Sequence, residues 1–179
     1  MAEIDRSERK ISEYSSKMLE IIKERRSIRE YKDETIPVEE LRLLIEAARW
    51  APSGSNLQPW KFVIITDKKL VKAIKMMSPG MFGDPPALII VCHDLSRADL
   101  PEKFQLIDIG AAMQNILLYA HTLGLGTCPV ASFDPEGVAD LLELPNHLKP
   151  IIIITVGKPV NRPPHTERLP LDQLIVRIY

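Results

Sequence analysis

Two short segments combine residue types that could bind an anionic ligand, and the first of them follows an apolar helical stretch. Residues 25–29 have the sequence Arg-Arg-Ser-Ile-Arg. Each Arg presents a planar fork of N–H donors that matches phosphate oxygens. Alternate residues share one side of an extended segment, so Arg25, Ser27 and Arg29 can face one phosphate. The alternative is a solvated cluster favoured by the C-terminus of the preceding helix.

The second segment offers polar side chains and backbone N–H groups that suit the edge of a heterocyclic ring. Residues 52–60 have the sequence Pro-Ser-Gly-Ser-Asn-Leu-Gln-Pro-Trp. One Gly and two Pro keep this segment out of a helix, so Ser53, Asn56 and Gln58 can point at a ligand. Taken alone, an ordinary polar turn explains the same composition.

Hydrophobic patterning predicts the elements that carry these segments. Apolar residues recur at helical spacing over 14–22, 38–48 and 104–123. Asp67 and Asp134 are placed to cap two shorter helices. Apolar runs at 62–66, 87–92, 125–131 and 151–156 predict strands. The order of these elements predicts a single α+β domain over residues 1–179, with helices around a mostly antiparallel sheet and a long helix at its centre.

The two ends of the chain differ from this pattern. Residues 1–10 are strongly charged, and we expect them to be flexible. The stretch from 158 to 172 is rich in proline, which excludes a helix or a central strand. The final apolar run, 174–179, predicts a strand. An unpaired apolar strand is an aggregation liability, so this strand is expected to dock elsewhere.

Composition narrows the class of protein. The chain has 179 residues, a formal net charge of −1 and 45% hydrophobic residues, which fits one globular domain that needs no disulfide or metal to fold. Cys92 and Cys128 lie in apolar surroundings, which favours reduced thiols and a cytoplasmic location. The four histidines lack ligand spacing, so no metal site is expected. The absence of a long apolar run, of a signal peptide and of a basic stripe argues against a membrane or nucleic-acid partner.

The two polar segments and three further motifs resemble the flavin-dependent nitroreductase family. The further motifs are Asp-Ile-Gly-Ala-Ala-Met-Gln-Asn at 108–115, Pro-Val-Ala-Ser-Phe-Asp at 129–134 and Gly-Lys-Pro at 157–159. The resemblance covers most of residues 21–179. It implies a nitroreductase-like fold and a homodimer in which the extended arm, residues 158–179, embraces the partner subunit. It also implies FMN as cofactor and NADH or NADPH as reductant.

The resemblance also assigns the cofactor contacts residue by residue. It implies that the FMN phosphate is held by Arg25, Arg26, Ser27, Arg29 and Arg168. It implies that the ring edge meets Pro52, Ser53, Gly54 and Asn56 of the other subunit, and that flavin N5 faces the backbone of Val130, Ala131 and Ser132. Many members have Gly or an acidic residue near the N5 segment, so a side-chain role there is not expected. Asp108 and Gln114 receive no role.

Two questions about substrates remain open at this stage. Met81 and Phe82, between Gly80 and Gly83, form a candidate lid over the substrate site, although such a pair also suits the core. The implied reaction is ping-pong hydride transfer from NAD(P)H to a small electron-poor acceptor such as a nitroaromatic, quinone or enone. The flavin carries the chemistry, so no catalytic side chain is expected. Alternatives are flavin fragmentation, reductive dehalogenation and a non-catalytic flavin-binding role.

Overall fold

A four-stranded antiparallel sheet forms the centre of the protein. The structure is a computed structural model that describes residues 13–97 and 99–179; the expectation for residues 1–10 therefore lies outside the described residues. The strands are β1 (Trp60–Ile65), β2 (Ala87–Asp94), β3 (Gly126–Val130) and β4 (Leu148–Gly157), in the spatial order β1-β2-β4-β3. All three strand pairs are antiparallel, which confirms the predicted α+β fold.

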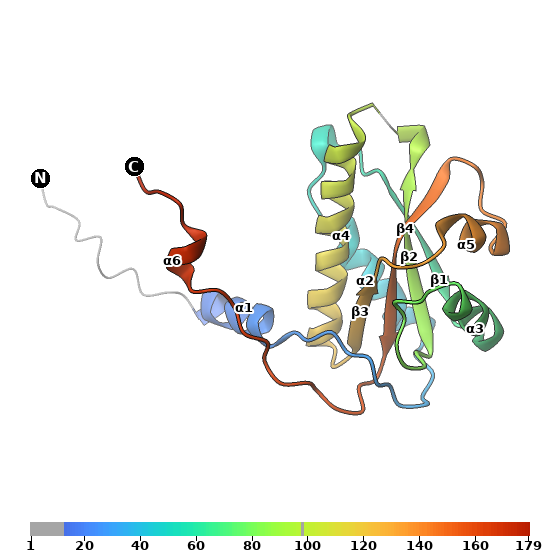
Figure 1. The fold of residues 1–179 in the computed structure, drawn as a ribbon, viewed down its shortest axis with the longest axis horizontal. Helices are drawn as coiled ribbons and strands as arrows, with labels where there is room; N and C mark the ends of the chain where they lie inside the picture. Colours follow the sequence, from blue (N-terminus) through green and yellow to red (C-terminus); the bar gives the residue numbers. More distant parts are fainter. Residues whose placement is uncertain (1–12, 98) are drawn as a thin grey trace, which may run out of the picture.

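Helices cover both faces of this sheet (Figure 1). They are α1 (Glu13–Glu24), α2 (Val38–Arg49), α3 (Lys68–Met76), α4 (Glu102–Thr122), α5 (Pro135–Leu141) and α6 (Leu171–Leu174), with short 3-10 turns η2 (Gly54–Asn56) and η3 (Leu95–Arg97). Side chains alternate along β2, so Ile89 and Val91 pack with α2 and α4, whereas Leu88 and Ile90 pack with α3 and α5. The long helix α4 and the sheet thus share the larger core.

The local capping predictions are confirmed. The carboxylate of Asp67 accepts hydrogen bonds from the backbone N–H groups of Lys69 and Leu70 at the start of α3. The carboxylate of Asp134 accepts one from Gly137 at the start of α5. The first strand begins two residues earlier than predicted, because Trp60 pairs with His93.

The predicted terminal strand is wrong for this chain taken by itself. Residues 171–174 form the short helix α6, and residues 175–179 carry no strand assignment. A strand is stabilised by the neighbour to which it hydrogen bonds, and no strand among the described residues pairs with this segment. The side chain of Val176 is 97% exposed. The arm instead projects from the body beside α1 (Figure 1).

Helix α4 is apolar around most of its circumference. One side packs in the core through Ile109, Ala112 and Ile116. The other side leaves Phe104, Ile107, Tyr119 and Leu123 exposed. A helix that is hydrophobic all round is normally buried all round, so the outer side of α4 is suited to a protein contact. None of the helices within the described residues combines the length and apolarity needed to cross a membrane.

Candidate functional site

The arginine segment runs as an extended chain along the edge of β3. The backbone N–H of Ile28 donates to the carbonyl of Thr127 at 2.9 Å, and Ser27 forms a parallel bridge with the same residue. Gly126 permits this approach, because a Cβ there would lie 2.7 Å from Cγ1 of Ile28. The absence of a side chain at residue 126 therefore lets the segment lie directly against the sheet.

Tyr31 fixes the same segment from the other side. Its partly buried hydroxyl donates to the carbonyl of Ile28 and lies 2.6 Å from Oγ1 of Thr155 on β4. Burial raises the pKa of Tyr31 well above its ordinary value, so the phenol keeps the proton that it donates. Sequence reasoning did not identify Tyr31, because its partner Thr155 is far away along the chain.

The root of the C-terminal arm pairs with the chain that follows the arginines. The N–H of Lys32 donates to the carbonyl of Lys158 at 2.9 Å, and the N–H of Val160 donates to the carbonyl of Glu30 at 3.1 Å. A bridge between Tyr31 and Pro159 lies between these two bonds. This pairing directs the arm back past the arginine segment.

The arm therefore adds basic groups to the arginine segment. Arg26 contacts Nδ1 of His165, and Arg162 donates to Nδ1 of His121 at 3.1 Å. Burial lowers the pKa of Arg25, and the neighbouring charge of Arg26 and the charge of Arg168 lower it further. The charge of Arg168 therefore acts on Arg25, and its role at the phosphate stays a proposal. The structure also adds Arg162, His165 and His121, which sequence reasoning missed because they come from the arm and from the last turn of α4.

Two donors of this cluster are buried without a partner among the described residues. They are Nη1 of Arg25 and Nε of Arg26. A buried donor that lacks an acceptor is costly, and an anion that accepts from both nitrogens would remove that cost. The donor set therefore fits a phosphate group such as that of FMN.

The segment matched to flavin N5 begins where β3 ends. Val130 is buried, whereas Ala131 and Ser132 are exposed. The carbonyl of Ser132 accepts from the N–H of Gly80 at 3.2 Å. The candidate lid is therefore anchored beside the candidate N5 segment.

The structure separates the two candidate lid residues. Met81 is only 4% exposed and packs with the core on the α3 side of the sheet, whereas Phe82 is 60% exposed. Gly83 has a φ of 71°, and a Cβ at this residue would lie 1.9 Å from the carbonyl oxygen of Arg29. This turn is packed tightly against the arginine segment. A lid role consequently stays a proposal for Phe82. Met81 is instead a core residue, which was the alternative that the sequence left open.

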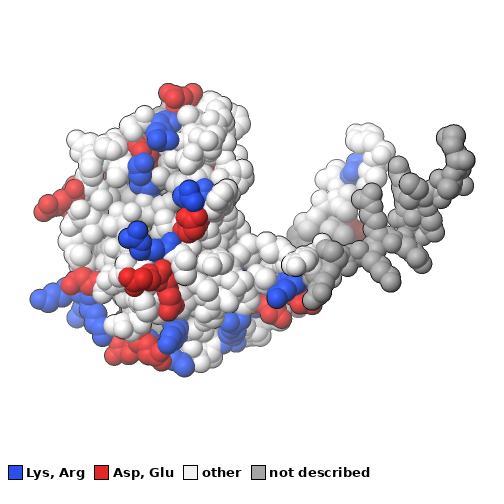
Figure 2. Space-filling model, turned by 180° about the vertical axis from the view of Figure 1, so that it is seen from behind, with Lys and Arg blue, Asp and Glu red and all other residues white. Residues whose placement is uncertain are grey.

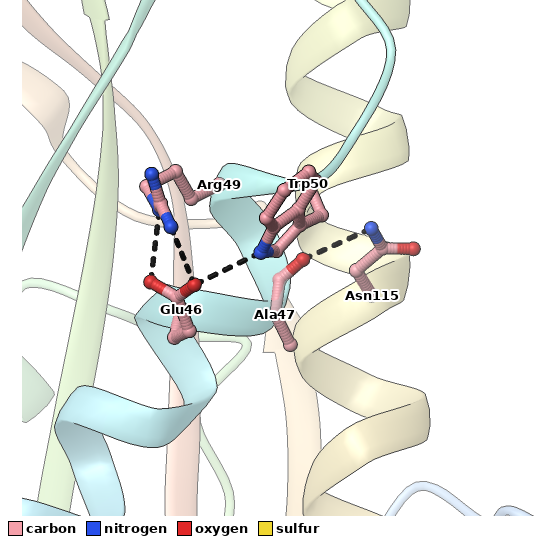
Figure 3. A network of polar contacts seen from close by, with 5 residues as sticks. All are labelled: Glu46, Ala47, Arg49, Trp50 and Asn115. Carbon is pink, nitrogen blue, oxygen red and sulfur yellow. Dashed lines mark hydrogen bonds and ion pairs between the residues drawn. The ribbon is translucent and has the colours of Figure 1, made fainter.

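The polar loop 52–58 leaves the C-terminal end of α2, which is held by the contacts in Figure 3. Asn115 on α4 donates to the carbonyl of Ala47 at 3.0 Å, and the indole of Trp50 donates to Glu46 at 2.9 Å. In the loop itself, the N–H of Gln58 donates to Oγ of Ser53 at 3.0 Å. The conformation is demanding, because the non-glycine residues Ser55, Asn56 and Gln58 all have positive φ.

The two halves of the expected cofactor site lie toward opposite ends of α4. The arginine cluster contacts His121 in the last turn, whereas the N–H of Gly54 donates to Asp108 near the first turns. At about 1.5 Å per residue, Asp108 and His121 are ~20 Å apart along the helix. In one chain, the arginine cluster and the polar loop therefore contact parts of α4 that lie far apart.

Comparison with known proteins assigns the family. The chain is 32% identical to "FMN reductase [NAD(P)H]" of Bacillus subtilis, over 87% of this chain and 72% of that protein. It is 28% identical to "Iodotyrosine deiodinase" of Thermotoga neapolitana, over 90% of this chain and 97% of that protein. Among solved structures, a protein assigned to the nitroreductases from Desulfovibrio desulfuricans, in complex with FMN, matches with a TM-score of 0.83 and 32% identity over 90% and 96% of the two chains. The nitroreductase family model matches residues 22–78 and 71–158, and the chain belongs to the nitroreductase family.

Proposed function

We propose that this protein is an FMN-dependent oxidoreductase. It takes hydride equivalents from NADH or NADPH and passes them in a ping-pong cycle to a small electron-poor acceptor such as a nitroaromatic, a quinone or an enone. The observation that carries the proposal is that two guanidinium nitrogens, Nη1 of Arg25 and Nε of Arg26, are buried without a hydrogen-bond partner among the described residues. The similarity to an FMN reductase and to a structure with bound FMN supports the choice of anion.

The chain's own residues bind and orient the cofactor in this proposal. Arg25, Arg26, Ser27, Arg29 and Arg168 hold the phosphate through charge-assisted hydrogen bonds. The loop of Pro52, Ser53, Gly54 and Asn56 meets the ring edge, and backbone groups of Val130, Ala131 and Ser132 face N5. Bound FMN supplies the hydride chemistry, so the protein contributes position and polarity. No group of three or more potential metal ligands is clustered in the described residues.

We also propose that the functional unit is a homodimer with two shared sites. Helix α4 exposes apolar side chains, and α1, which contacts α4, exposes Met18, Leu19 and Ile22. The apolar end of the arm pairs with no strand among the described residues. A second copy that covers these surfaces would place its own loop 52–58 against the phosphate cluster. Figure 2 shows acidic and basic residues interspersed over the visible face of the body, a pattern that does not favour a nucleic-acid partner.

The visible absorption spectrum of the purified protein with FMN tests this function. We expect a bound-flavin spectrum that bleaches on anaerobic addition of NADH or NADPH and recovers when a quinone is added. Bound flavin that stays oxidised with both nicotinamides would support a non-catalytic flavin-binding role. Protein that retains no flavin would contradict the proposal.

Reductive dehalogenation is a second candidate, favoured by the similarity to an iodotyrosine deiodinase. The short connection between β1 and β2, which contains only α3 and one turn, leaves little chain to enclose a halogenated amino acid. Iodide release from iodotyrosine by the reduced holoprotein would support this candidate. Oxygen-dependent loss of the protein's own flavin would instead indicate flavin fragmentation.

A further inference from the structure

The loop that carries Ser53, Gly54 and Asn56 is braced by residues to which the cofactor assignment gives no role. Asp108, on the second turn of α4, is only 8% exposed. Its Oδ2 accepts a hydrogen bond of 3.1 Å from the backbone N–H of Gly54. A carboxylate that accepts from a backbone N–H forms one of the stronger hydrogen bonds in proteins.

Leu100 also packs against Gly54. The side chain of Leu100 fills the space beside Gly54, because a Cβ there would lie 2.6 Å from Cδ1 of Leu100. Gln105, fully buried and one turn before Asp108 on α4, donates to the carbonyl of Leu100 at 2.6 Å. The other end of its amide accepts from Nε2 of His93 at 2.7 Å. Gly54 is therefore held by Asp108 on α4 and by Leu100, which Gln105 on α4 holds in turn.

This bracing matters because the loop's backbone is costly to maintain. Ser55, Asn56 and Gln58 have φ values of 49°, 56° and 51°, in the left-handed region that side chains disfavour. Such conformations persist only where the surroundings over-determine them. The hydrogen bond from the N–H of Gln58 to Oγ of Ser53 closes the loop internally, whereas Asp108 connects the loop to the core.

We propose that Asp108 is a positioning residue that holds the 53–58 loop in the conformation that meets the flavin ring. This inference rests on the proposed function, since the loop must contact a flavin. Asp108 acts through Gly54 and does not touch the cofactor. Its removal should therefore weaken binding of the ring and leave the phosphate cluster unchanged.

The test compares FMN with riboflavin, which has the same ring and no phosphate, on Asp108→Ala, Asp108→Asn and the wild-type protein. Asp67→Ala is the matched control, because it removes a carboxylate that accepts backbone N–H bonds at the start of α3. We expect the dissociation constants of Asp108→Ala to rise about tenfold for both flavins. Asp108→Asn, which keeps the volume and one oxygen acceptor, should lie between Asp108→Ala and wild type.

Hydrogen exchange in the flavin-free protein provides a readout without ligand. We expect the amides of 53–58 to exchange at least tenfold faster in Asp108→Ala than in Asp67→Ala. Wild-type exchange rates in the loop, or a loss of affinity confined to FMN, would overturn the role of Asp108. If Asp108→Ala does not fold, Asp108→Asn decides by the same criteria: weaker binding of both flavins supports the role, and wild-type binding of both overturns it. Wild-type protein that binds neither flavin would instead overturn the proposed function.

Discussion

At the scale of single residues, the guanidinium of Arg25 is partly buried and lies next to another positive charge, both of which disfavour its charged form. Its Nη1 is buried without a partner in the part of the chain that the structure describes, and burial together with the charge of Arg26 lowers the pKa of Arg25. The surrounding cations repel one another in the absence of an anion. A bound phosphate would decrease each of these costs, so the cluster favours an anionic ligand.

Arg25→Ala and Arg168→Ala should each weaken FMN binding without weakening riboflavin binding. Each change removes charge-assisted bonds to phosphate worth about 1.5–3 kcal/mol, which corresponds to roughly a 10- to 150-fold rise in the FMN dissociation constant. Fluorescence titration of both flavins measures the effect, with Arg42→Ala on α2 as the control. Equal losses for the two flavins would contradict the phosphate assignment.

His121 gives the cluster a pH dependence. Burial is the largest cause that lowers the pKa of His121 below the ordinary 6.5, and the charge of Arg162 is the next. The charge of Glu24 raises this pKa, whereas the charges of Arg25 and Arg26 lower it. The folded chain thus favours the neutral ring, and the unfolded chain binds more protons just below pH 6.5. The contribution of neutral His121 to the free energy of unfolding is therefore present above pH 6.5. It is lost as the pH falls through the lowered pKa of His121 in the folded state.

Urea unfolding of the flavin-free protein at about pH 7.5 and about pH 5.5 checks this linkage. We expect the free energy of unfolding to decrease at the lower pH, and to decrease less in His121→Gln. His147→Gln, at an exposed position, should retain the wild-type difference. A His121→Gln variant whose free energy of unfolding keeps the full wild-type pH dependence would rule out His121 as the origin of that dependence.

At the scale of elements, the arginine segment is a strand-like connection held by three different neighbours. β3 bonds to Ile28, the arm root bonds to Glu30 and Lys32, and Tyr31 links Ile28 to β4. The segment therefore does not depend on α1 for its place. Its rigidity keeps the donors in position before the ligand arrives, which reduces the entropy cost of binding.

Tyr31→Phe should destabilise the flavin-free protein by about 1–3 kcal/mol, because the carbonyl of Ile28 and the hydroxyl of Thr155 lose a buried partner. It should also weaken FMN binding, since Ile28 lies between Ser27 and Arg29. Chemical denaturation and FMN titration measure the two effects. Tyr14→Phe, whose ring is 87% exposed on α1, is the control, and matching stabilities in the two variants would refute this account.

At the scale of the whole molecule, the separation of the two half-sites along α4 has a direct consequence for mixed dimers. If one site combines Arg25 of one subunit with the loop of the other, a dimer of one Arg25→Ala chain and one Asn56→Ala chain contains one intact site and one doubly altered site. If each chain forms its own site, the same dimer contains none intact.

Co-expression of the two variants with different affinity tags tests this arrangement. We expect each variant alone to retain little FMN, and the doubly purified mixed dimer to bind one FMN per dimer with wild-type affinity. A co-expressed pair of Arg25→Ala and Arg168→Ala chains is the matched control, because both changes affect the same half-site and should restore nothing. Weak binding in the mixed dimer would contradict the shared site.

Removal of residues 171–179 should weaken the dimer and, through it, FMN binding. These residues expose Leu171, Leu174, Val176 and Ile178, and burial of such side chains against a second subunit contributes roughly 25 cal/mol per Å². Sedimentation velocity at several protein concentrations, followed by FMN titration, measures both effects. A truncated monomer that binds FMN as tightly as the full chain would exclude an intersubunit role for the arm.

Local signals in the sequence determined most of the elements. Hydrophobic period, two Asp caps and apolar runs located the helices and strands to within a few residues, because these signals act between near neighbours in the chain. The apolar run at 174–179 also predicted a strand, and this prediction is wrong for the single chain. A strand requires a neighbouring strand with which it forms hydrogen bonds, and the local sequence cannot supply that neighbour. Residue motifs also predicted, by resemblance, the residues proposed for the two half-sites.

Only the tertiary structure decided how those residues are related in space. It brought His121, Arg162 and His165 to the arginines, divided Met81 from Phe82, and placed Asp108 beneath Gly54. The contacts of the arginines and of Gly54 join residues that are far apart along the chain, so tertiary packing and not local propensity brings them together. The sequence by itself therefore predicted which residues could bind a flavin, whereas the length and packing of α4 decided that the arginine cluster and the loop at 52–58 contact opposite ends of that helix.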